Sequence, residues 1–130
     1  MSASRVHILL VEDTFLHARI VQRCLQNDYV LTVEETVEDA YTCLTETPVD
    51  LLLVDWSLPG KNGLALVQTV RESDAFGDIP IIMQTGEDRE EYVRRALEAG
   101  VDDYIAKPIA CTTLQEKVAN LIPNSTAGDR

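Results

Sequence analysis

Acidic, hydroxyl and amino side chains follow four of the apolar runs in this chain. They are Glu12, Asp13, Asp55, Thr85 and Lys107. Carboxylate oxygens are the ligands that Mg²⁺ prefers in proteins. A lysine can hold a phosphoryl oxygen as a point charge, and a threonine hydroxyl can donate to another. Together these groups can support phosphoryl transfer, which depends on positioning and on charge neutralisation.

Each of these residues also has an ordinary structural explanation. An acid such as Asp55 at the end of a strand is more often a turn or capping residue than a reactive one. Thr85 alone is typical of a turn, and Lys107 alone is typical of a solvated charge. The functional hypothesis therefore depends on all four strand ends carrying the required types together.

Short apolar runs alternate with segments of helical periodicity along the whole chain. Strands are expected at residues 6–11, 29–34, 50–55, 79–84 and 102–106, and helices at 14–27, 37–46, 63–73, 88–99 and 112–122. Five such pairs predict a parallel sheet with helices on both faces. In such a sheet ligands bind at the carboxyl ends of the strands, where the reactive types collect.

Several helix ends have sequence signals. Asp88 with Glu91, and Thr112 with Gln115, have the spacing of capping boxes at the start of a helix. Gly100 is expected to close the helix that begins near Asp88. Residues 1–123 are interpreted as one domain, and the polar residues 124–130 as a tail or the start of a linker.

Composition narrows the possible partners and the compartment. The 130 residues carry a formal net charge of −11, from 22 acidic and 11 basic residues, which argues against direct binding of nucleic acid or anionic lipid. No apolar stretch approaches the ~20 residues that cross a bilayer, and no signal peptide is recognised, so a cytoplasmic location is expected. Cys24, Cys43 and Cys111 are widely spaced, and we expect packing roles for them rather than a disulfide or a zinc site.

Four segments resemble the receiver domains of bacterial response regulators. They are LLVED at 9–13, LLVDWSLPGKNG at 52–63, PIIMQTG at 80–86 and AGVDDYIAKP at 99–108. The similarity extends over residues 6–122. It implies a flavodoxin-like five-stranded parallel sheet of order 2-1-3-4-5, flanked by five helices. It also implies a phospho-accepting signalling switch of a two-component system rather than an enzyme.

The resemblance assigns a role to each site residue. Asp55 would accept the phosphoryl group from a phosphohistidine on a sensor histidine kinase or phosphotransfer protein. Asp13 would bind Mg²⁺ directly, Glu12 would act through a coordinated water, and the main-chain carbonyl of Ser57 would be a further ligand. Lys107 would pair with the phosphoryl group, and its peptide bond to the following proline would be cis.

The resemblance also implies a switch. Thr85 would move toward the phosphoryl oxygens, and Tyr104 would turn inward to fill the space. The fourth helix, fifth strand and fifth helix would then present a changed surface to a downstream protein. A homodimer through this surface is also possible.

Some positions depart from the usual pattern or tune it. Gly86 stands where alanine is more usual, and should loosen its loop. Ser57 and Glu87 occupy two positions that tune self-dephosphorylation in the family. Ala110 replaces a common acid before the last helix, so Thr112 is expected to cap that helix.

Three further residues near these motifs are expected to be structural. Trp56 should pack partly over the site, while His7 and His17 should have structural roles because neither ends a strand.

Three alternative functions remain open. A magnesium phosphohydrolase with an aspartate nucleophile would place a second acid at the position of Ser57, which cannot serve as general acid or base. A receiver-like scaffold would usually have lost one of the site residues. A flavin-binding module would need a phosphate-binding loop after the first strand. The sequence does not decide whether the chain is complete or part of a larger regulator or hybrid kinase.

Overall fold

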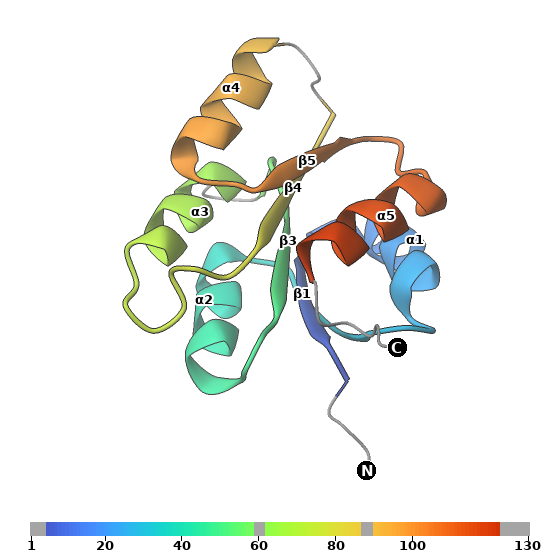
Figure 1. Cartoon of the computed structure of the whole chain (residues 1–130), viewed down its shortest axis with the longest axis horizontal. Coiled ribbons are helices and arrows are strands. Elements are labelled where there is room, and N and C mark those ends of the chain that lie inside the picture. The colour runs from blue at the N-terminus through green and yellow to red at the C-terminus, as the bar shows by residue number, and fades with distance from the viewer. Residues whose placement is uncertain (1–4, 59–61, 87–89, 123–130) are drawn as a thin grey trace.

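The computed structural model describes residues 5–58, 62–86 and 90–122, which form a helix–sheet–helix sandwich (Figure 1). The strands are β1 (His7–Val11), β2 (Val30–Glu34), β3 (Leu51–Asp55), β4 (Ile81–Thr85) and β5 (Asp103–Ala106). The helices are α1 (Phe15–Leu25), α2 (Val37–Glu46), α3 (Gly63–Arg71), α4 (Glu90–Ala99) and α5 (Cys111–Leu121). The residues proposed as tail, 124–130, lie outside the described ranges.

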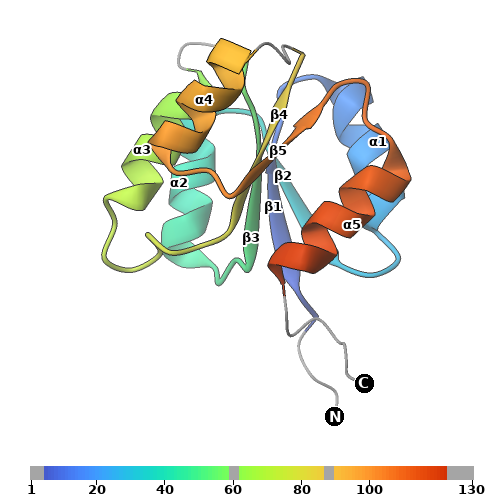
Figure 2. The same ribbon diagram turned by 45° about the horizontal axis from the view of Figure 1, so that its top comes forward.

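All neighbouring strands are parallel, and their order is β2-β1-β3-β4-β5. The predicted fold class and strand order are therefore confirmed. Helices α1 and α5 cover one face of the sheet, while α2, α3 and α4 cover the other (Figure 2).

The central strand β3 is buried over its whole length, as a continuous apolar run predicts for a parallel sheet. Successive side chains of a strand point to opposite faces. Leu51 and Leu53 accordingly pack in the core beneath α1 and α5, whereas Leu52 and Val54 pack beneath α2, α3 and α4. This alternation also determines which face each residue at a strand end occupies.

Helix ends follow the sequence signals only in part. Gly100, with φ of +113°, follows the last residue of α4 as predicted. The predicted cap Asp88 lies outside the described residues. Thr112 does not cap α5, because the helix begins at Cys111 and its N-cap residue, Ala110, makes no side-chain cap. Burial of Leu114 and Val118 against the sheet holds this helix instead.

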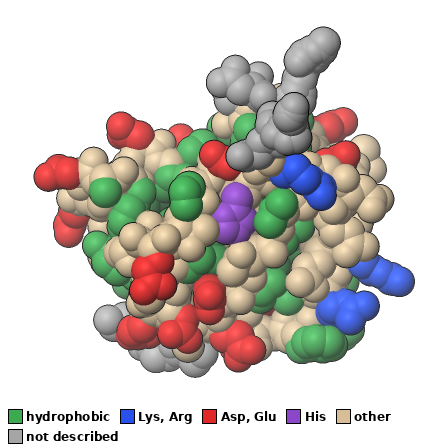
Figure 3. All heavy atoms as spheres, turned by 90° about the horizontal axis from the view of Figure 1, so that it is seen from below, with side chains coloured by type: hydrophobic (Ala, Val, Ile, Leu, Met, Phe, Trp, Pro, Cys, Tyr) green, Lys and Arg blue, Asp and Glu red, His purple; other side chains and the backbone are tan. Residues whose placement is uncertain are grey.

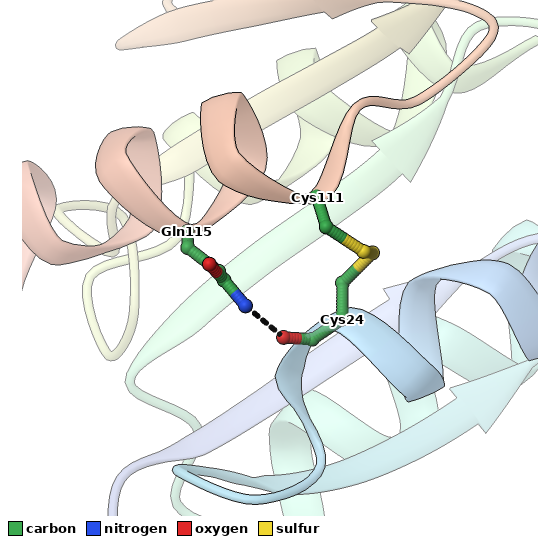
Figure 4. The surroundings of a disulfide bond; sticks show 3 residues. All are labelled: Cys24, Cys111 and Gln115. Carbon is green, nitrogen blue, oxygen red and sulfur yellow. Dashed lines mark hydrogen bonds between the residues drawn. A yellow bond between two sulfur atoms is a disulfide. The ribbon is translucent and has the colours of Figure 1, made fainter.

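A disulfide joins Cys24 of α1 to Cys111 of α5, so the expectation that these cysteines only pack was wrong (Figure 4). The two residues are 87 positions apart in the sequence, and only the side-by-side packing of α1 and α5 brings their Cα atoms within 5.1 Å. Gln115 reinforces the contact by donating from Nε2 to the carbonyl oxygen of Cys24 at 2.8 Å. Cys43 is a free thiol that packs, partly buried, against the core beneath α2, α3 and α4, in agreement with the packing role expected for it.

The surface reflects the acidic composition. On the face seen from below in Figure 3, Asp and Glu side chains lie mainly along the left, lower and upper parts of the view, whereas the Lys and Arg side chains lie toward the right. Within the described part of the chain, no helix is long and apolar enough to cross a membrane.

Candidate functional site

Three carboxylates meet at the carboxyl ends of β1 and β3. Val11 pairs with Val54 in the sheet, so the residues that follow them are neighbours as well. Glu12, Asp13 and Asp55 each offer an oxygen, and these oxygens all lie within 4.8 Å of one another. Glu12 and Asp55 are buried, while Asp13 is exposed. The fold thus brings together the three acids that the sequence singled out.

Lys107 lies among these acids. Its Nζ is 3.0 Å from Asp55 Oδ1 and 3.7 Å from Glu12 Oε1. The lysine backbone is fixed because its N–H donates to the carbonyl oxygen of Thr85 at 2.9 Å, and its peptide bond to Pro108 is cis, as predicted. A cation is therefore held against the carboxylate of Asp55 in a largely desolvated position.

The environment of Glu12 opposes its ionisation. Burial, together with the neighbouring charge of Asp55, raises the pKa of Glu12 to about 7, although Lys107 acts in the opposite direction. The backbone N–H of Thr14 donates to Glu12 Oε2 at 3.3 Å. The other oxygen, Oε1, is buried without a hydrogen-bond partner.

These features fit a hard divalent cation. One lysine cannot neutralise three clustered carboxylates, and a buried carboxylate oxygen that accepts no hydrogen bond from the described residues can serve as a ligand. Ser57, two residues after Asp55, donates its backbone N–H to Asp55 Oδ1 at 3.4 Å. The residues that the sequence proposed as magnesium ligands are thus close to one another.

Thr85 and Tyr104 lie on the opposite face of the sheet from Asp55. Thr85 is buried at the end of β4, and Tyr104 on β5 packs against the core beneath α2, α3 and α4. Lys117 Nζ lies 5.7 Å from the centre of the Tyr104 ring. A methyl group at Gly86 would meet no atom of the described residues within 4 Å, and Glu87 lies outside those residues.

Trp56 packs next to the site, as expected. Its ring meets that of Tyr92 edge to face, with 5.4 Å between centroids, and the Arg95 guanidinium lies 5.6 Å from its centre. Its backbone N–H donates to the carbonyl oxygen of Gln84 at 2.8 Å. The residue after Asp55 therefore connects β3 to both β4 and α4.

The two histidines have different surroundings. His7 bonds through its ring to the carbonyl oxygen of Pro48 at 2.8 Å and to the Thr32 hydroxyl at 2.7 Å, far from the acids. His17 Nδ1 lies 4.0 Å from Glu12 Oε1, nearer the site than its place in the sequence suggested.

The sequence interpretation missed one residue, Gln84. The sequence indicates no role for Gln84 beyond ending a strand, yet the residue is fully buried beside the site. The available signal is a polar residue within the otherwise continuous apolar run of a buried parallel strand.

Comparison with known proteins places the chain in a family. The sequence model of the response regulator receiver domain family matches residues 8–119. A chemotaxis protein CheY homolog from Campylobacter jejuni is 40% identical over 119 residues, covering 88% of this chain and 91% of the relative. The sensor histidine kinase TmoS from Ectopseudomonas mendocina is 34% identical over 122 residues, which are 94% of this chain but 12% of the kinase.

A solved structure agrees. The CheY-like response regulator receiver domain protein from Methanospirillum hungatei superimposes with a TM-score of 0.84 at 25% identity, covering 94% of this chain and 97% of that one. The chain therefore belongs to the response regulator receiver domain family. Members of this family are signalling switches of two-component and chemotaxis systems, and they work with histidine kinases or phosphotransfer proteins.

Proposed function

We propose that this receiver domain accepts a phosphoryl group on Asp55, with Mg²⁺, from a histidine kinase or a phosphotransfer protein. The observation that supports this most directly is the 3.0 Å contact between Lys107 Nζ and Asp55 Oδ1 inside a cluster of three carboxylates. A structural ion pair alone would not need two further acids at the same place.

In the proposed reaction a carboxylate oxygen of Asp55 attacks phosphorus. The new O–P bond forms as the P–N bond to the donor histidine breaks, and the imidazole nitrogen keeps the bonding electron pair. Lys107 neutralises charge on the phosphoryl oxygens. Asp13, Asp55 and the carbonyl of Ser57 would bind Mg²⁺, with Glu12 acting through a water; the cation supplies charge neutralisation when bound.

The proposed output follows from the opposite face of the sheet. Thr85 would be drawn toward the phosphoryl group, and Tyr104 would follow into the space beside β4. Gly86, Ser57 and Glu87 would tune the lifetime of the acyl phosphate. The surface of α4, β5 and α5 would then bind a downstream protein, or a second copy of the chain.

The first test is a mass measurement. The purified chain is incubated with Mg²⁺ and acetyl phosphate, and its intact mass is determined. We expect the gain of one acid-stable, base-labile phosphoryl group. Samples with a metal chelator or with Asp55→Asn should show no gain, whereas Asp74→Asn, which removes an exposed acid outside the cluster, should behave as the unaltered chain. No gain in the unaltered chain would favour an unphosphorylated scaffold.

A further inference from the structure

Gln84 is buried together with the residues of the proposed site. Among the described residues four polar or charged side chains are buried, and they are Glu12, Asp55, Gln84 and Thr85. Three of them have roles in the proposed phosphoryl transfer or in the switch that follows it. The fourth, Gln84, has no role there, although none of its surface is exposed (0%).

The sheet places Gln84 beside the acceptor. Asp55 on β3 pairs with Gln84 on β4, and Gln84 pairs with Ile105 on β5. Side chains of paired residues point to the same face, and Ile105 packs in the core beneath α1 and α5. The side chain of Gln84 therefore lies on this face, one strand spacing (about 4.8 Å) from that of Asp55.

The side chain of Lys107 has to extend past Gln84 to reach Asp55. The lysine follows β5, whereas its ammonium group lies against Asp55 on β3 and near Glu12 after β1. Strand β4 is between β5 and β3, and Gln84 is its residue on this face at this level. The stem of Lys107 thus passes over the end of β4 where Gln84 stands.

Core packing alone does not explain why an amide side chain occupies position 84 of β4. Both Gln84 Oε1 and Gln84 Nε2 are buried without a hydrogen-bond partner. Buried polar groups are almost always paired, and an apolar side chain would fill this strand position without that cost. Unpaired buried atoms at a site point to a partner that arrives in another state of the protein.

We propose that Gln84 is a positioning residue for Lys107. During transfer, Oε1 of Gln84 accepts a hydrogen bond from the lysine ammonium, and Nε2 donates to a carboxylate oxygen of Asp55. A lysine ammonium has three donors, so it can form this bond to an uncharged acceptor as its other donors pass from the Asp55 carboxylate to the phosphoryl oxygens. The inference rests on the proposed function, since it assumes transfer to Asp55.

The test compares Gln84→Met with Met83→Leu. Gln84→Met keeps the unbranched shape and removes the amide, while Met83→Leu alters the same strand on its opposite face, in the core beneath α2, α3 and α4. The rate of phosphorylation by acetyl phosphate with Mg²⁺ is followed by intact mass. We expect Gln84→Met to slow it by about three- to tenfold, the factor of one hydrogen bond, and Met83→Leu to leave it unchanged.

Two further measurements separate positioning from a structural role. Gln84→Met should unfold at the same or a higher denaturant concentration than the unaltered chain, because it removes an unpaired buried amide. In a Lys107→Ala background the effect of Gln84→Met on the rate should disappear, because the residue acts through that lysine.

Three outcomes would contradict the inference. An unchanged rate in Gln84→Met would show that the amide is only an unpaired core group. Effects of Gln84→Met and Lys107→Ala that multiply would show that Gln84 acts independently of the lysine. Absence of phosphorylation in the unaltered chain would instead overturn the proposed function, and the inference with it.

Discussion

The ring of Trp56 meets that of Tyr92 edge to face, with 5.4 Å between their centroids. Trp56 directly follows Asp55, and Tyr92 belongs to α4, in which Ala96 is the buried residue. Because so little of α4 is buried, the aromatic contact is a substantial part of its attachment to the rest of the domain. The acceptor strand and the helix of the proposed output surface are thus in direct contact.

Tyr92→Ala is therefore expected to lower the free energy of unfolding by about 1 kcal/mol through loss of the edge-to-face pair, in addition to the loss of the buried ring area. It should also change the emission of Trp56, the single tryptophan of the chain. Urea unfolding followed by fluorescence measures both effects. Tyr92→Phe keeps the ring and serves as control, and equal destabilisation by both variants would contradict a role for ring packing.

Gly63 and Gly86 both lie near the site, and the effects of adding a side chain at the two positions can be compared. A Cβ at Gly63 would clash with the carbonyl oxygen of Asp55 and approach Val54 Cγ1 to 2.7 Å, whereas a Cβ at Gly86 would meet no atom of the described part of the chain within 4 Å. Gly63→Ala should lower the free energy of unfolding by roughly 1–3 kcal/mol and displace the acceptor. Gly86→Ala should change it by less than about 0.5 kcal/mol. Thermal unfolding of the two variants side by side tests this, and similar melting temperatures would contradict it.

The disulfide between Cys24 and Cys111 should contribute to stability. It closes a loop of 87 residues, so its loss is expected to cost about 2–5 kcal/mol, mainly by releasing the unfolded chain. The melting temperature of the unaltered chain should fall when a reductant is added. The double variant Cys24→Ser, Cys111→Ser should have a lower melting temperature than the unaltered chain, and a reductant should not change it. Cys43→Ser, at the free thiol, should retain the response. A melting temperature that neither the reductant nor the double variant lowers would contradict a stabilising disulfide.

The sequence predicted the order and type of every helix and strand, because apolar runs and helical periodicity are local patterns. Most boundaries shifted by a residue or two, as at β4, which begins at Ile81 rather than Ile79. The start of α5 was missed for a physical reason. Thr112 has the composition of a cap, but packing of the helix on the sheet and its crosslink at Cys111 decide where it begins.

The sequence predicts the part of the site that follows from strand ends alone. Residues at the carboxyl ends of parallel strands meet, which brings Glu12, Asp55 and Lys107 together. Contacts that depend on side-chain direction across the sheet were not foreseeable in this way. The place of Gln84 beside Asp55 follows from strand register, and the pairing of Cys24 with Cys111 from helix packing.

Lys107→Ala is expected to separate metal binding from switching. The variant keeps Glu12, Asp13 and Asp55, so it should still bind Mg²⁺, detected by Trp56 fluorescence. It should not transmit the phosphoryl state, because no cation would link the phosphoryl group to the β5–α5 loop. Hydrogen exchange with Mg²⁺ and beryllofluoride should change in β5 and α5 of the unaltered chain only.

Arg5→Ala is the control for that experiment. Arg5 donates to the carbonyl oxygens of Gln26 and Asn27, away from β5 and α5, so its loss should leave the response of β5 and α5 to beryllofluoride in place. A normal response in Lys107→Ala would show that the assigned role of this lysine is wrong.

The pKa of Glu12 predicts how the stability of the metal-free protein depends on pH. The carboxyl group has an ordinary pKa of 4.5, and burial beside Asp55 raises it to about 7 in the folded chain. Between these values the folded chain holds a proton that the unfolded chain has released, so the free energy of unfolding should fall as pH rises through this range. The contribution is fully present below pH 4.5 and is lost once pH exceeds about 7. Melting temperatures with a chelator should show this fall in the unaltered chain and a weaker one in Glu12→Gln, and parallel curves for the two would contradict the assignment.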